Sequence, residues 1–243
     1  MPWEFTILVL LLGVVVPWRA AVRMRQLLSL PATTSRQRLL IYASTMAFQW
    51  LVSGVALGRA FVHGFTPQAL GLALQAPAFT FALVLPLCAL MAASQFYGLR
   101  RLARLPPGER GFAEPLARRM LPQNSKEALV FVALAATVSV CEEFLYRGIL
   151  LAALERMGLA MIFAVLISTA LFALGHLYQG PKGMIGTFVL GFAFCVLRIT
   201  TGSLVPCVAI HFAIDVVAGL AAPHLLAPGA ESAALVSSVE GTG

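Results

Sequence analysis

Long apolar stretches, separated by short polar segments, follow one another along most of the chain. A helix needs about 20 apolar residues to cross the hydrocarbon core of a bilayer, and seven stretches approach or exceed that length. They lie at 3–18, 39–58, 77–97, 128–152, 158–178, 183–199 and 204–222. The pattern predicts an all-α fold, a polytopic transmembrane bundle of about seven to eight helices.

The composition agrees with a membrane location and argues against a soluble domain. Hydrophobic residues make up 60% of the 243 residues and charged residues only 11%, whereas soluble domains carry about 25% charged residues. The mean hydropathy is +0.89. We therefore expect an integral, multi-pass membrane protein in contact with the lipid bilayer.

The basic residues gather in two segments between the apolar stretches. They are Arg19, Arg23, Arg25, Arg36 and Arg38 in the first segment, and Arg100, Arg101, Arg104, Arg110, Arg118, Arg119 and Lys126 in the second. One predicted helix precedes the first segment and three precede the second, so both fall on the same side. The positive-inside rule makes that side cytoplasmic. Topology thus accounts for the net charge of +7, and no nucleic acid is expected as a partner.

The chain divides into three expected parts. Residues 1–124 would hold N-terminal membrane helices and the basic cytoplasmic loops, residues 125–222 the helices with candidate chemistry, and residues 223–243 a flexible C-terminal tail. The first apolar stretch has no basic residue before it and several after it. It is therefore expected to be an anchor with its N-terminus outside, and not a cleaved signal peptide.

Six ionisable residues inside the predicted membrane helices are the candidates for a functional site. They are Glu142, Glu143, Arg147, His176, His211 and Asp215. A charged side chain near the middle of a bilayer costs at least about 2.5–3.5 kcal/mol on insertion scales. Such residues normally face the bundle interior or a water-filled cavity, so a functional site is the leading hypothesis.

Helical spacing gives these residues different expected partners. Glu143 and Arg147 are four residues apart with the acid first, an arrangement that favours an ion pair. Glu142 is rotated by about 100° from Glu143 and is left free of that pair, as a candidate general base. His211 and Asp215 are also four apart, and their side chains could hydrogen-bond on one helix face.

The motifs formed by these residues resemble those of a known family. Glu142-Glu143-x-x-x-Arg147, then Phe172-x-x-x-His176, then His211-x-x-x-Asp215 are similar to the three motifs of the CPBP intramembrane proteases. That family includes the type II CaaX prenyl endopeptidases and the bacterial Abi group of bacteriocin-processing and self-immunity proteins. The likeness covers roughly residues 125–220 and extends to RGILLAAL, LISTALFALGHL and TGSLVPCVAIHFAIDV. Many members have asparagine where this chain has Asp215, and an ionised aspartate cannot donate a hydrogen bond.

The resemblance implies an endopeptidase, a helix bundle around a polar cavity that hydrolyses peptide bonds. Glu142, assisted by His176, would activate a water molecule. His211, together with Asp215, would stabilise the oxyanion of the tetrahedral intermediate. Glu143 and Arg147, the supporting pair, would hold the site in shape.

Metal dependence stays open at the level of the sequence. No cofactor is favoured, because a glutamate and two histidines can activate water without a metal. Zinc is the alternative, since Glu142, His176 and His211 would form a His₂Glu set of the kind that zinc hydrolases use. The HExxH signature of many such enzymes is missing.

The depth of the site is a difficulty for the predicted topology. Glu142 lies about 15 residues, or roughly 22 Å, from the cytoplasmic start of its helix. His176, in contrast, is expected near the cytoplasmic end of the next helix. Upright helices would keep the two apart, so tilt or a later helix start would be needed.

Two further functions and the substrate stay open. A catalytically silent scaffold or partner-binding protein of the same fold is one alternative. A small transporter is the other, because membrane acids and histidines also serve ion pathways. For a protease, the expected partner is a peptide or protein substrate at the membrane, lipidated or not. Arginine greatly outnumbers lysine, a bias that favours a bacterial source and hence the bacterial inner membrane.

Overall fold

The computed structural model describes residues 3–30, 32–74 and 76–227, and each regular element in this part of the chain is helical. The elements are α1 (Trp3–Leu10), η1 (Leu11–Val15), α2 (Val16–Ser29), α3 (Ser35–Val62), α4 (Pro77–Ala103), α5 (Ala113–Arg119), α6 (Ser125–Glu143), η2 (Phe144–Leu150), α7 (Leu151–Arg156), α8 (Met161–Gly175), η3 (Leu177–Gln179), α9 (Gly180–Thr201) and α10 (Val205–Leu226). Here η1 and η2 are π-helical turns inside longer helices, and η3 is a 3₁₀ turn. The described residues therefore form eight helices, which confirms the all-α prediction.

Six of these helices are long and apolar enough to cross a membrane. They are Trp3–Ser29, Ser35–Val62, Pro77–Ala103, Ser125–Arg156, Leu177–Thr201 and Val205–Leu226, with Met161–Gly175 as a shorter apolar helix. Each overlaps one of the seven predicted stretches. Large apolar side chains such as Leu51, Leu85 and Ile185 are exposed on the outside, where a bilayer would cover them. The protein is an integral, multi-pass membrane protein.

The helix ends differ from the sequence-based boundaries because capping groups set them. The Thr34 hydroxyl accepts a hydrogen bond from the Gln37 backbone N–H, and the Gln37 side chain accepts one from the Thr34 N–H, so α3 begins at Ser35. At the other end of the chain, α10 continues to Leu226, beyond the expected start of the tail at residue 223. The rest of the predicted tail, residues 228–243, lies outside the described residues.

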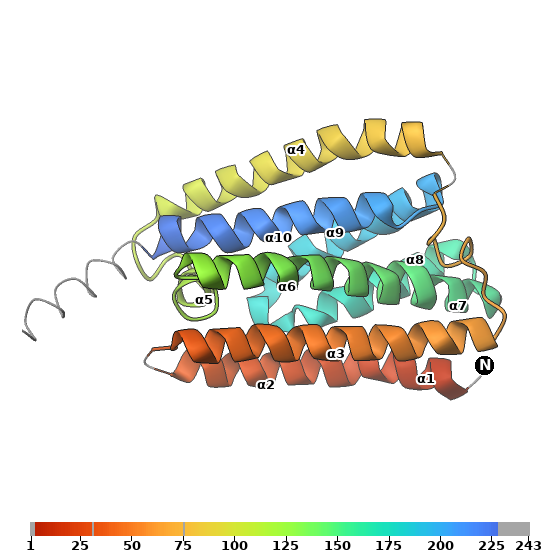
Figure 1. Ribbon diagram of the computed structural model, residues 1–243, viewed down its shortest axis with the longest axis horizontal. Helices are drawn as coiled ribbons and strands as arrows, with labels where there is room; N and C mark the ends of the chain where they lie inside the picture. The colour runs from red at the N-terminus through yellow and green to blue at the C-terminus, as the bar shows by residue number, and fades with distance from the viewer. Residues whose placement is uncertain (1–2, 31, 75, 228–243) are drawn as a thin grey trace, which may run out of the picture.

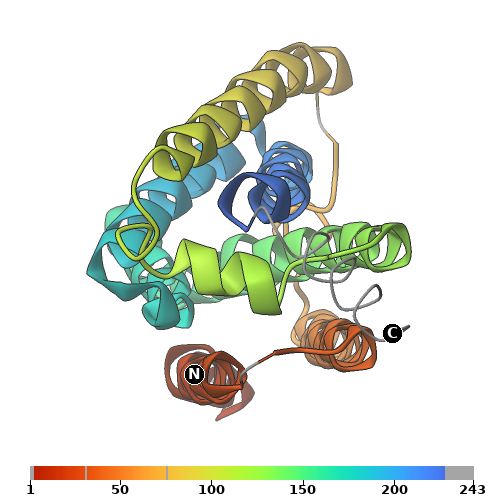
Figure 2. The same ribbon diagram turned by 90° about the vertical axis from the view of Figure 1, so that its left-hand side faces the viewer.

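The helices surround α10, which lies inside the bundle. α4 packs along α10 on one side and α6 packs against it on another. The helix formed by α1, η1 and α2 lies beside α3, and α3 packs on α6 (Figures 1 and 2). α8 and α9 form a further antiparallel pair. The N-terminal helices thus cover one side of the segment that carries the candidate motifs.

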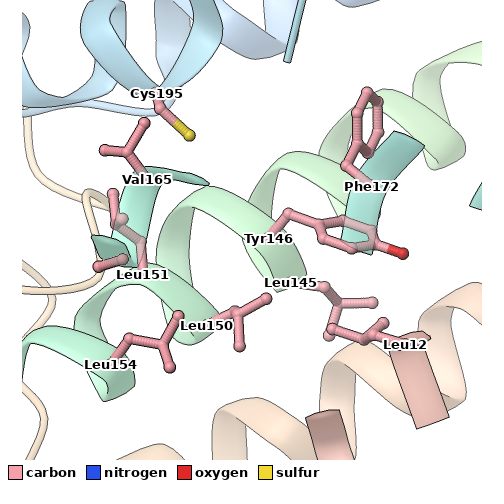
Figure 3. Packing of buried hydrophobic residues seen from close by; sticks show 10 residues of the cluster. Leu12, Leu145, Tyr146, Leu150, Leu151, Leu154, Val165, Phe172 and Cys195 are labelled. Atoms are coloured by element: carbon pink, nitrogen blue, oxygen red, sulfur yellow. The ribbon is translucent and has the colours of Figure 1, made fainter. Parts of the chain in front are cut away.

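An apolar cluster fixes this segment against its neighbours. It comprises Leu12, Leu145, Tyr146, Leu150, Leu151, Leu154, Ala164, Val165, Phe172 and Cys195 (Figure 3). These residues come from η1, η2, α7, α8 and α9, so the cluster joins the N-terminal helix to the motif-bearing helices. Interiors packed in this way hold neighbouring side chains in defined rotamers.

The short helix α8 resolves the difficulty over depth. Its end, next to His176, is about 15 residues from its start at Met161, or roughly 22 Å. Glu142 lies about 14 residues, or roughly 21 Å, before the end of α7 at Arg156. Because α7 and α8 are joined by a short turn, the two residues reach similar depth from that turn. His176 therefore lies part-way along the bundle, and not at the cytoplasmic end as the sequence had suggested.

Candidate active site

A π-helical turn shapes the helix that carries the two glutamates. α6 ends at Glu143, and the seven residues Phe144–Leu150 then form η2 before α7 continues the helix. Such turns are rare and often occur at functional sites, because one extra residue in the turn re-aims the side chains around it. At Gly148 a Cβ would stand 3.1 Å from the Leu70 carbonyl oxygen. The turn thus packs tightly against the loop that leads from α3 to α4.

The carboxylate of Glu143 joins two helices. Its Oε1 accepts a hydrogen bond from Arg147 Nη1 at 3.1 Å. The same oxygen lies 2.9 Å from His211 Nδ1 on α10. The predicted ion pair between Glu143 and Arg147 is therefore present, and both side chains are fully buried. The Arg147 guanidinium also stands 4.0 Å from the centroid of the Phe172 ring. Gly191 leaves room for it, since a Cβ there would be 2.8 Å from Arg147 Nη2.

Glu142 is held by one hydrogen bond and keeps one oxygen free. Gln49 Nε2 on α3 donates to Glu142 Oε1 at 3.1 Å. The other oxygen, Oε2, is buried and has no hydrogen-bond partner in the described part of the chain. Glu142 is thus separate from the ion pair of its neighbour, as the helical spacing predicted.

The two histidines have different surroundings. His176 caps the end of α8, and its Nδ1 is 3.0 Å from the Phe172 carbonyl oxygen. A carbonyl only accepts, so Nδ1 carries the proton and Nε2 is free to accept. His211 on α10 has Nδ1 against Glu143, while its Nε2 is 3.6 Å from Asp215 Oδ2. The expected bond between His211 and Asp215 is therefore a longer contact, and the closest carboxylate is Glu143.

A cavity of about 1200 Å³ connects these groups. Glu142, Tyr146, His176, His211 and Asp215 all line it. Glu143 and Arg147 lie behind this wall and do not line the cavity. The structure therefore brings all six sequence-predicted residues to one place, four at the cavity surface and two as an inner support.

The zinc set considered from the sequence does not fit this arrangement. The ring nitrogens of His211 both face carboxylates, with Nδ1 2.9 Å from Glu143 Oε1 and Nε2 3.6 Å from Asp215 Oδ2. Among the described residues, no three His, Cys, Asp or Glu side chains lie in positions that could hold a metal ion. Glu142, His176 and His211 all line the cavity.

Sequence reasoning missed Gln49 and the contact between His211 and Glu143. Gln49 belongs to α3, outside the motifs, and its one signal is an amide inside an apolar stretch, AFQWLV. The histidine and the glutamate are 68 residues apart in sequence. Only the packing of α10 against the motif helix joins them.

The fold and this site define a class, that of all-helical membrane proteins with a buried cavity of glutamate and histidine. Within it, residues 124–217 match the family model described as "Type II CAAX prenyl endopeptidase Rce1-like". The match covers all three motifs, and the CPBP family assignment made from them is confirmed over this segment. Searches of the curated proteins and of the solved structures each found no match.

Proposed function

We propose that this protein is an intramembrane endopeptidase that cleaves membrane-associated or lipidated proteins or peptides. The observation that carries the proposal is the free oxygen of Glu142. It is a buried carboxylate oxygen without a partner, in a residue that lines one cavity with two imidazoles. Buried polar groups are rarely left unpaired in proteins, and a water molecule bound there would satisfy this one. The family match over residues 124–217 supports a hydrolase of this type.

In the proposed reaction Glu142 acts as general base. Its Oε1 is fixed by Gln49, which leaves Oε2 to take a proton from water. His176 Nε2 assists, since its Nδ1 is occupied by the Phe172 carbonyl. The resulting hydroxide attacks the peptide carbonyl carbon. When the tetrahedral intermediate collapses, the C–N bond breaks and Glu142 returns the proton to the leaving amine.

His211 is the proposed oxyanion donor. Contact with the Glu143 carboxylate at Nδ1 orients the ring. In the proposed step the ring is an imidazolium, so that Nε2 also carries a proton to donate. Asp215 Oδ2 lies 3.6 Å from that nitrogen, beyond hydrogen-bond distance. Glu143 and Arg147 hold the ring in place from behind. We propose these steps without a metal ion, since a glutamate and two histidines can activate water and stabilise the oxyanion by themselves.

The orientation and location follow the charge pattern. We propose that the ends carrying the two basic segments are cytoplasmic, by the positive-inside rule. The chain has 17 basic residues, of which Lys126 and Lys182 are the only lysines. This bias supports a bacterial inner membrane as the location.

Membrane peptides in cells test the proposal directly. Cells producing the Glu142→Gln protein should accumulate uncleaved substrates that cells with the natural protein process. Glu155→Gln is the matched control, because Glu155 lies on the same continuous helix but is exposed and far along it. If the two variants gave the same peptides as the natural protein, the protease proposal would be wrong and the scaffold alternative would stand.

A further inference from the structure

One face of α2 lines the same cavity as the candidate site. Its lining residues are Val16, Arg19, Ala20, Arg23, Met24, Gln26 and Leu27, and Leu30, which follows the end of α2, lines the cavity as well. They recur at the spacing of three and four residues that keeps side chains on one helix face. Trp18 and Arg25, which belong to other faces of α2, do not line the cavity. The positive-inside rule explains why arginines occur in this segment, but it does not explain why two of them face the cavity.

Neither Arg19 nor Arg23 has a carboxylate partner among the described residues. Arg23 is half-buried and donates to the Ser44 hydroxyl at 2.6 Å. The Arg19 guanidinium stands 4.6 Å from the centroid of the Phe48 ring. Glu109 also lines the cavity, and it forms no ion pair with either arginine. By contrast, the buried arginines Arg38 and Arg147 are each paired with a glutamate.

Two contacts on α3 link this basic face to the candidate catalytic carboxylate. Phe48, which contacts Arg19, is the chain neighbour of Gln49, which donates to Glu142. Phe48 and Gln49 both line the cavity. A peptide whose scissile bond reached Glu142 would therefore extend past α2.

We propose that Arg19 and Arg23 form a subsite that binds a carboxylate of the peptide substrate, on an acidic residue near the scissile bond. The inference rests on the proposed function and adds a substrate preference to it. Two arginines four residues apart have Cβ atoms about 5–6 Å from each other and repel. A carboxylate between them relieves that repulsion, and the arginine fork binds it with two parallel hydrogen bonds. A lipid phosphate has similar chemistry, but the peptide is the partner that must enter this cavity.

Binding can be measured separately from cleavage. The probe is a set of fluorescent, acylated decapeptides in which one glutamate occupies each position in turn, with glutamine twins. The receptor is the full Glu142→Gln chain in phosphatidylcholine nanodiscs, so that bound peptide is not consumed. At one or two positions the glutamate peptide should bind about tenfold more tightly than its twin. Arg19→Gln and Arg23→Gln should each reduce this preference severalfold, while Arg25→Gln, which removes the same charge from another face, should keep it.

The outcomes separate this inference from the proposed function. If glutamate and glutamine twins bind alike, or if Arg25→Gln loses the preference as fully as Arg23→Gln, the subsite is wrong. If the twins bind alike and phosphatidylglycerol stabilises the protein unless Arg23 is changed, the occupant is a lipid phosphate and the inference is overturned. If the preference appears but the natural chain cleaves none of the peptides, the subsite stands as an acidic-peptide site and the protease proposal fails.

Discussion

Glu127 and Glu142 lie on the same helix and are both shielded from bulk water, but their carboxylates accept very different numbers of hydrogen bonds. Glu127, near the start of α6, is completely buried. Its carboxylate accepts from Arg38 Nε at 2.7 Å and Nη2 at 3.0 Å, from the Gln123 N–H at 2.9 Å and from Asn124 Nδ2 at 2.8 Å. Glu142, near the other end of α6, accepts one bond, from Gln49.

The difference shows how a buried acid can serve structure or chemistry. Each oxygen of Glu127 accepts two hydrogen bonds, and the bonds from Arg38 tie α3 to α6. Neither oxygen is left free to take a proton from water. At Glu142 one oxygen has no partner among the residues that the structure describes. Glu143 is intermediate, with Oε1 shared by Arg147 and His211 and Oε2 unpaired. The number of satisfied oxygens therefore separates Glu127 from Glu142, and access to the cavity separates Glu142, which lines it, from Glu143, which does not.

Removal of the structural acid should give the largest loss of stability. Glu127→Ala leaves the buried Arg38 without a counter-charge, and breaking a buried pair in this way costs about 3–5 kcal/mol. Unfolding in detergent, followed by circular dichroism, measures the change. A loss below about 1 kcal/mol would show that the saturated pair does not hold the N-terminal helices to α6.

Removal of the positioning amide should lower the rate and leave the fold intact. Gln49→Leu frees Glu142 Oε1, and we expect kcat to fall about 10- to 100-fold, since one misplaced group costs that much. KM and the unfolding midpoint should change little.

The neighbouring Trp50→Phe is the control for this change. It removes the bond from Trp50 Nε1 to Thr137 Oγ1 and touches no group of the cavity. Equal rate losses in Gln49→Leu and Trp50→Phe would show a general effect of α3 packing, and the assigned role of Gln49 would be abandoned.

Crowding the supporting arginine should have a moderate effect. In Gly191→Ala the new Cβ would meet Arg147 Nη2 at 2.8 Å and the Phe172 ring at 3.1 Å, and overpacking costs about 1–3 kcal/mol. We expect lower stability together with a slower cleavage rate, because Arg147 and Glu143 orient His211. Gly186→Ala, on the same helix, places its Cβ in open space and should change neither the stability nor the cleavage rate. If Gly186→Ala lowered both as much as Gly191→Ala, the effect would belong to α9 as a whole and not to Arg147.

The smallest effect is expected for an exposed ion pair on α5. Arg118 Nη2 lies 3.1 Å from Glu114 Oε1, and the arginine side chain is 48% exposed. Surface pairs of this spacing contribute below about 0.5 kcal/mol, so Arg118→Gln should unfold almost as the natural protein does. A loss comparable to that of Glu127→Ala would break the distinction between saturated buried pairs and exposed ones.

The sequence predicted the helices and the local pairing well because both depend on short spacings. Apolar stretches predicted each membrane helix, and the four-residue spacing predicted the pair of Glu143 with Arg147. Contacts between helices were beyond its reach. The bond from Gln49 and the contact of His211 with Glu143 depend on how α3 and α10 pack on α6. The π-helical turn has no clear sequence signal either, and its effect on side-chain direction appears only in the structure.

The most direct test is to measure cleavage and stability together on the purified Glu142→Gln protein in a bilayer, with a peptide substrate identified from the cell comparison. A general base contributes about 10²–10⁴-fold to the rate. The account predicts a loss of at least about 100-fold in the single-turnover rate, with an unfolding midpoint equal to that of the Glu155→Gln control. Cleavage at the natural rate, or a loss of activity explained by unfolding, would contradict the central role of the free carboxylate oxygen.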